Sequence, residues 1–136
     1  MVGETNLSSL LSEMAPELAP APFVFAAVNN PSAALRTSAF MVCEESEATT
    51  LVLPASLADQ VVKPSAPYAR ITLRVHSSLE AVGLTAIVAE SLRADNIPAN
   101  VIAGFYHDHV FVPWDTRDAA LRALLRVRDQ SRVSSA

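Results

Sequence analysis

The clearest pattern of hydrophobic and polar positions lies in residues 70–112, in the second half of the chain. Apolar and polar residues alternate through residues 71–76, which predicts a strand with one buried face. From Leu84 onward the apolar residues recur with a helical period, which predicts an amphipathic helix ending near residues 95–96. This segment therefore begins as a strand followed by a helix.

Two more strands and a helix follow. Residues 97–106 and 109–112 are apolar and β-prone, and His107 with Asp108 between them predicts a two-residue hairpin turn. Asp115 is placed to cap a last helix, whose inward leucines follow it at helical spacing. The second half thus has the order β-α-β-β-α, which is one strand short of a ferredoxin-like unit.

The first half is less regular. Asn6 predicts the start of a short helix over residues 7–14, whose apolar residues form one stripe. Three prolines end that helix. Short strands are expected after them, with a small helix beginning at Pro54; the strands are residues 23–28, 38–43 and 49–53.

Two prolines in residues 62–67 mark an extended linker, which divides the chain into domains at residues 1–63 and 68–130. The polar tail is a poor source for the missing strand. We therefore expect the halves to lend each other strands, or to pack edge to edge, in one sheet. The predicted fold is α+β, with two ferredoxin-like units of antiparallel sheet and helices on one face.

Composition excludes several classes of protein. The chain has 136 residues, of which 51% are hydrophobic, enough for a buried core. Its net charge of −4 argues against a nucleic-acid partner. It contains no apolar run of membrane-spanning length and no secretory signal pattern at its start. Cys43 is the one cysteine, expected as a small buried hydrophobe, and a cytoplasmic location follows by default.

Cofactor and metal signatures are weak. With three glycines in the sequence, phosphate-binding and dinucleotide-binding loops are excluded, and no cofactor is expected. His107 and His109 share one face of an extended chain, and His76 ends another strand. Zinc takes three or four protein ligands, so a polar hairpin tip is the better interpretation of these histidines and no metal is predicted.

The loop before the helix at Leu84 is the candidate binding site. Backbone N–H groups at a helix start attract carboxylates, and Gly83 permits a ligand to approach closely. Ser77 and Glu80 also fit a capping box, so a purely structural role is the alternative. The candidate loop residues are Ser77, Ser78, Leu79, Glu80, Val82, Gly83 and Leu84.

The run VHSSLEAVGLTAIVAESLRADNIPANVIAGFYHDHVFVP resembles the C-terminal half of small proteins built from two ACT domains. These are similar to the paired regulatory ACT domains of aspartokinases and of arginine sensors. The first half resembles the group's N-terminal domain in its LSSLLSEMAPEL opening. The resemblance implies a regulatory module that binds amino acids where ACT units meet, and a homodimer. It also implies that Asn100, Val101 and Ile102 face a partner unit's loop. It does not imply catalysis.

Three functions remain open. In the first, a ligand's carboxylate meets the N–H groups near Gly83, and its amine meets Glu80, His107 or Asp108. In the second, the same residues perform acid–base chemistry on a small metabolite. In the third, the module docks on another protein through a sheet edge or its helices. The sequence favours the first.

Overall fold

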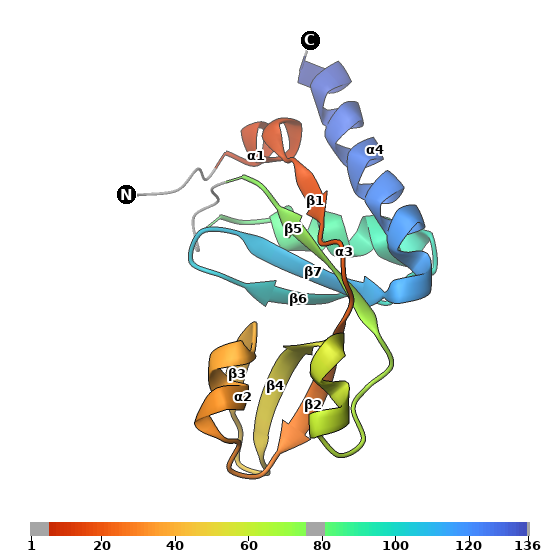
Figure 1. The fold of residues 1–136 in the computed structure, drawn as a ribbon. Helices are drawn as coiled ribbons and strands as arrows, with labels where there is room; N and C mark the ends of the chain where they lie inside the picture. The colour runs from red at the N-terminus through yellow and green to blue at the C-terminus, as the bar shows by residue number, and fades with distance from the viewer. Residues whose placement is uncertain (1–5, 76–80, 136) are drawn as a thin grey trace. The chain divides into compact units, whose positions relative to one another are not determined.

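The structure of the protein is a computed structural model that describes residues 6–75 and 81–135. The chain forms two compact units (Figure 1). Unit 1 combines the N-terminal segment up to Ala19 with the chain from Arg70 onward, and unit 2 is Pro20–Ala69. The chain therefore enters unit 2 and returns to unit 1, while the linear division at residues 1–63 and 68–130 stays a prediction.

Unit 2 is a small antiparallel sheet with helical segments packed on it. Its strands lie in the order β3-β4-β2, and Phe23 of β2 also pairs with Tyr68 at the start of β5. A core cluster of Val24, Leu35, Leu51 and Leu53 holds the unit together. The elements are β2 (Phe23–Val28), α2 (Ala33–Ser38), β3 (Met41–Glu44), β4 (Thr49–Pro54) and the 3-10 helix η1 (Ala55–Gln60).

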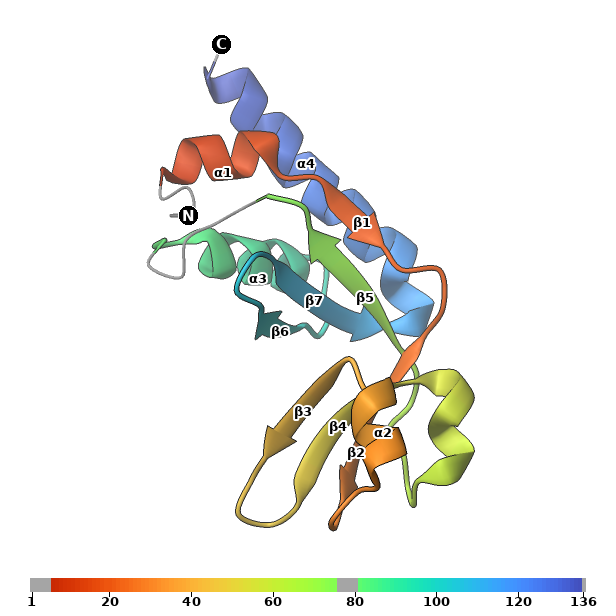
Figure 2. The same cartoon turned by 60° about the vertical axis from the view of Figure 1, so that its left-hand side comes forward.

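The described residues of unit 1 form four strands in the order β1-β5-β7-β6. Helix α4 packs on β1 and β7, and α1 and α3 both pack on α4, so the helices cover one face of this sheet (Figures 1 and 2). The elements are α1 (Leu7–Glu13), β1 (Pro16–Leu18), β5 (Tyr68–Leu73), α3 (Leu84–Ala94), β6 (Asn100–Ala103), β7 (Asp108–Pro113), the 3-10 helix η2 (Trp114–Thr116) and α4 (Arg117–Ser135).

Strand β1 supplies the strand that the second half lacks. It pairs antiparallel with β5, so that Glu17 lies opposite Thr72. Alternation along β5 places Ile71 and Leu73, both essentially unexposed, under the helices, and Thr72 on the opposite face. The α+β fold with antiparallel sheets and helices on one face is confirmed, and the strand that the halves share is β1.

The N-terminal helix confirms its predicted cap. The Asn6 side chain accepts a hydrogen bond from the Ser9 backbone N–H at 3.0 Å, and Leu10 of α1 is fully buried. In unit 2 the expected strand over residues 38–43 is partly wrong, because α2 occupies residues up to Ser38. Ser32 caps this helix through a 3.2 Å bond from the Leu35 N–H.

Cys43 is exposed, so the prediction that it is a buried hydrophobe is wrong. It lies on β3, which is an edge strand paired only with β4 within unit 2. Along β3 only Met41 is partly buried, because the strand has little packed against it. The apolar run around Cys43 indicated a strand correctly but not how much of it is covered.

Candidate functional site

Helix α3 begins at the glycine of the predicted binding loop. Gly83 is its N-cap and has a left-handed backbone, φ 102° and ψ −19°. Helix α3 itself begins at Leu84, and the capping box of Ser77 and Glu80 stays a prediction. Ser77, Ser78, Leu79 and Glu80 lie outside the described residues, as does His76.

Gly83 has a structural role as well as an accessible position. A Cβ atom there would lie 3.1 Å from Leu7 Cδ2, so the glycine allows α1 to pack against the start of α3. Its carbonyl accepts the Ile87 N–H at 3.0 Å, which is the first turn of the helix. Val82 beside it is 83% exposed, whereas Leu84 is buried in the core. Packing and left-handed geometry both require glycine here.

The first turn of α3 follows Gly83, which has no side chain to cap it. No side chain among the described residues caps it, so the N–H groups of Leu84, Thr85 and Ala86 receive no cap from the N-cap residue. No acidic side chain lies in that turn either. The positive end of the helix dipole is therefore not neutralised by an acidic side chain of the first turn.

The three predicted β6 residues lie on the edge of the unit 1 sheet. Register with β7 places Asn100 opposite Phe111, Val101 opposite Val110 and Ile102 opposite His109. Asn100 is exposed, and the other two are half-buried. Within unit 1 the outer edge of β6 pairs with no described strand, so its backbone is available to a further chain.

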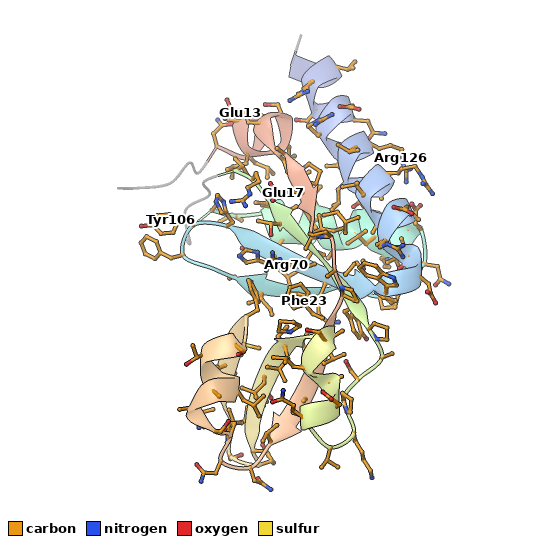
Figure 3. All side chains as sticks on the ribbon, viewed as in Figure 1. Glu13, Glu17, Phe23, Arg70, Tyr106 and Arg126 are labelled. Atoms are coloured by element: carbon orange, nitrogen blue, oxygen red, sulfur yellow. The ribbon has the colours of Figure 1, made fainter. Side chains whose placement is uncertain are left out.

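The hairpin turn between β6 and β7 is not where the sequence placed it. Ala103 pairs with Asp108, and the Gly104 N–H donates to the His107 carbonyl at 2.9 Å, so Phe105 and Tyr106 form the turn. The prediction of a turn at His107 and Asp108 is wrong, because β6 ends earlier than expected and Asp108 already belongs to β7. The two turn aromatics are mostly exposed, and Figure 3 shows Tyr106 at the tip of the hairpin.

Gly104 explains where this turn forms. A Cβ atom at this position would lie 2.8 Å from the His107 carbonyl oxygen and 3.3 Å from His109 Nε2. The first distance is shorter than any ordinary Cβ contact. Only glycine lets the chain close here, and the turn carries His107 toward the end of β5.

His107 lies beside the start of the predicted loop. Its Nδ1 is 3.4 Å from the carbonyl oxygen of Val75, the last described residue before the loop. Burial raises the pKa of the neighbouring Asp108 above its usual value, and the positive charge of His107 partly opposes that rise. The structure therefore brings His107 to Val75, the residue before the predicted loop, whereas Asn100 lies at the far end of β6.

The sequence did not single out a second group of polar side chains in unit 1. We call it the polar face; it consists of Glu17, Arg70, Thr72, Arg74, His107 and His109. Thr72 is 4% exposed, and its Oγ1 lies 2.9 Å from His109 Nδ1. The sequence contains a signal for this group, because Arg70, Thr72 and Arg74 alternate with apolar residues in ARITLR and therefore lie on one face of the strand.

Metal ligation finds no support in the described part of the chain. No three His, Cys, Asp or Glu side chains among those residues gather closely enough to hold an ion. His107 instead contacts a backbone carbonyl and His109 a hydroxyl. None of the described helices combines the length and apolar character that crossing a bilayer requires.

A shallow groove is lined by none of the predicted ligand residues. It follows the exposed side of α3 and the turn after it, and its lining includes Ala89, Arg93 and Pro98. Arg93 forms a 2.6 Å ion pair with Glu90 along its edge. The lining combines three alanines, Ile97 and Pro98 with the polar side chains of Glu90, Arg93 and Asn96.

Comparison with known families shows to which family the chain belongs. Two models of the ACT domain match the chain, one over residues 2–70 and one over residues 65–126. The chain belongs to the ACT-domain family. It consists of two ACT domains, and the search of curated proteins found no match to it.

The solved structures that resemble this double-ACT chain include both small proteins and regulatory parts of enzymes. A protein of unknown function from Vibrio cholerae, described as a possible transport protein, is 42% identical, with a TM-score of 0.80; the match covers 90% of this chain and 95% of that one. The ligand-free regulatory subunit of aspartate kinase from Thermus thermophilus is 8% identical, with a TM-score of 0.60, and the match covers 82% and 95%.

Aspartokinase III from E. coli, solved with aspartate and ADP, is 13% identical, with a TM-score of 0.64. The match covers 83% of this chain but 33% of the enzyme. At this identity the aspartate kinases show the shared fold alone. The two ACT-domain models support a regulatory, ligand-binding type of module.

Proposed function

We propose that this double-ACT protein is a regulatory module that binds a free amino acid or a close analogue. The observation that carries the proposal is the start of α3, where a left-handed glycine leaves the first-turn N–H groups without a side-chain cap from the described residues. Such groups favour a carboxylate, which every free amino acid carries.

The ligand's carboxylate would lie at the N–H groups after Gly83, in the loop formed by Ser77, Ser78, Leu79, Glu80 and Val82. Its amine would contact Glu80, His107 or Asp108. The nearness of His107 to Val75 supports this arrangement, because it brings one predicted polar contact to the end of the strand that leads into the loop.

A second copy of the chain would complete the site. We propose that Asn100, Val101 and Ile102 of one copy face the loop of the other, in a cytoplasmic homodimer. The open edge of β6 supports this, since an edge strand of this kind pairs readily with another chain. The exposed Asn100 side chain would then contact the ligand.

Thermal unfolding in the presence of each proteinogenic amino acid at millimolar concentration tests the proposal. A ligand at 100 times its Kd stabilises the folded state by about 2.7 kcal/mol, so at least one amino acid raises the Tm by several degrees. Asn100→Ala reduces that shift, whereas Asn29→Ala, an exposed asparagine of unit 2, keeps it. If every amino acid leaves the Tm unchanged, the proposed ligand class is wrong.

A further inference from the structure

Two exposed aromatic rings form the tip of the hairpin between β6 and β7. Phe105 is 64% exposed and Tyr106 is 60% exposed. Their rings pack edge to face with centroids 5.2 Å apart, and Figure 3 shows Tyr106 pointing away from the strands. Aromatic side chains held in this way lose little conformational entropy on binding and often anchor protein interfaces. The tip is therefore suited to enter a groove of another molecule.

The groove beside α3 supplies a matching hollow in the same unit. It lies where the exposed side of α3 meets the turn that leads into β6, and its volume is about 680 Å³. Ala86 and Ala89 line it from the helix, and Ile97 and Pro98 line it from the turn. Apolar walls with small side chains leave room for an aromatic ring. Unit 1 thus carries both an aromatic tip and a groove of the kind that receives one.

The outer edge of β6, which pairs with no described strand, determines how the tip and the groove of two copies meet. Two identical strands that pair antiparallel around a two-fold axis exchange equivalent contacts. The register that uses all of Asn100–Ala103 places Val101 of one copy opposite Ile102 of the other. Two residues further along, this register places Phe105 opposite Pro98 of the second copy. Paired strands lie about 4.8 Å apart, so the ring reaches the groove.

We propose that Phe105 of one copy enters the α3 groove of a second copy, and that the two-fold axis repeats this contact in reverse. The inference rests on the proposed homodimer and names the side chains beyond the β6 edge that hold it together. A pair of strands four residues long adds few backbone hydrogen bonds. Two buried aromatic rings withdraw further apolar surface from water and stabilise the dimer.

The charges around the groove favour a second copy over a charged partner. Glu90 and Arg93 are the two charged side chains in its lining, and they form an ion pair with each other at 2.6 Å. The groove therefore has no net charge, and the two aromatic rings of the tip carry none. Nucleic acids and anionic membranes are recognised by an excess of positive charge, which this groove lacks. An uncharged aromatic tip and an uncharged groove are complementary to each other.

Disulfide trapping between two full-length variants tests the contact directly. Both variants carry Cys43→Ser, and one adds Phe105→Cys while the other adds Pro98→Cys. We expect mild oxidation of the mixture to give a cross-linked dimer that joins positions 105 and 98, identified by mass spectrometry. The other contact of that mixed dimer keeps its natural residues. Each variant alone should stay uncross-linked, because equivalent positions lie about 23 Å apart along the paired strands.

Val133→Cys in place of Phe105→Cys gives the control for random collision. Val133 lies on α4 and is 76% exposed, so its thiol is accessible but far from the proposed contact. The control mixture should give no cross-link to position 98. The inference is overturned if the first mixture gives no cross-link, or if the control mixture gives as much.

The dissociation constant of the dimer, measured by analytical ultracentrifugation, shows what the contact contributes. Phe105→Ala removes the ring and Ala89→Gln fills the groove, so each should weaken the dimer about tenfold. Ala94→Gln, at an exposed position of α3 outside the groove, should leave it unchanged. A dimer that neither of the first two variants weakens overturns this inference alone, and a wild-type monomer overturns the homodimer with it. Failure of every amino acid to raise the Tm contradicts the ligand class and leaves this contact standing.

Discussion

At the scale of single residues, Gly83 and Gly104 have different structural roles. Gly83 provides a left-handed backbone and room for Leu7, while Gly104 lets a turn close against the His107 carbonyl. The sequence pointed to Gly83 as a site residue but gave no reason to separate packing from binding. The contact of Gly83 with Leu7 joins residues far apart in the sequence, so no local pattern encodes it, whereas Gly104 and His107 meet within one turn.

Gly104→Ala is expected to destabilise the protein by about 1–3 kcal/mol, the usual cost of forcing extra atoms into filled space. The new Cβ would lie 2.8 Å from a backbone oxygen, which gives way less easily than the end of a flexible side chain. Urea unfolding measures the change. Ala103→Ser adds one atom at the exposed neighbouring position and should change stability by less than about 0.5 kcal/mol. Equal costs for the two substitutions would contradict the steric explanation.

His109 makes stability depend on pH. Its pKa in the folded protein lies below the ordinary value of 6.5, so the unfolded chain takes up a proton first as the pH falls. Stability is therefore full above pH 6.5 and declines below it, until the pH passes the folded pKa. Urea midpoints between pH 7.5 and pH 5.5 should show this decline.

His109→Gln serves as the control for that decline. The variant should show a flatter pH dependence over the same range, since it removes the group with the lowered pKa. Asp108 acts with the opposite sign, because its raised pKa favours the folded state as the pH falls toward the usual carboxyl value. An unchanged slope in His109→Gln would therefore assign the decline to other groups.

At the scale of elements, strand β1 and helix α1 show what a periodic pattern reveals and what it misses. Helix α1 followed from its leucine spacing and its Asn6 cap, both of which are local. Strand β1 has three residues and begins at a proline, so nothing local marks it. It exists because β5 offers a partner far along the chain, which is why only the need for a further strand could be foreseen.

Leu10→Ala is expected to cost about 2–5 kcal/mol, although it lies in a helix of seven residues. Leu10 has no exposed surface, and α1 packs against α4, where the Arg132 Nε donates to the Ser12 carbonyl at 2.7 Å. Thermal or urea unfolding measures the loss. Val133→Ala, at a position of α4 that is 76% exposed, should change stability little. A small effect of Leu10→Ala would show that α1 is not integral to unit 1.

At the scale of the whole molecule, the mass in solution tests the proposed homodimer. Light scattering coupled to size-exclusion chromatography should give twice the chain mass of 14.5 kDa. Ile102→Lys, on the edge strand β6, should weaken the dimer, whereas Val42→Lys, on the edge strand β3, should not. The two substitutions place the same charge on different edges. A monomer in the wild type, or equal effects of both substitutions, would contradict assembly through β6.

The fold class followed from the sequence because most elements of unit 1 show either alternating apolar and polar residues or apolar residues at helical spacing. The candidate site was predictable only in part: Gly83 lies at the start of α3, as the pattern indicated, whereas the turn predicted at His107 and Asp108 forms two residues earlier. The polar face was harder to foresee, because it depends on the register of three strands. Glu17 and Arg74, for example, meet across 57 positions of sequence.

The return of the chain from unit 2 to unit 1 has a consequence for folding. Ala19 and Arg70 border unit 2, and the Ala19 N–H donates to the Arg70 carbonyl at 2.9 Å, so the segment between them leaves and re-enters at one point. Closing so long a loop costs entropy in an unfolded chain. Once residues 20–69 have folded, however, β1 and β5 are already held near each other at the Phe23–Tyr68 pair, and that cost has largely been met. Once folded, unit 2 thus holds the start of β5 close to the end of β1. The pairing of these two strands, the most distant in sequence within unit 1, becomes nearly local, which should shorten the folding time of unit 1.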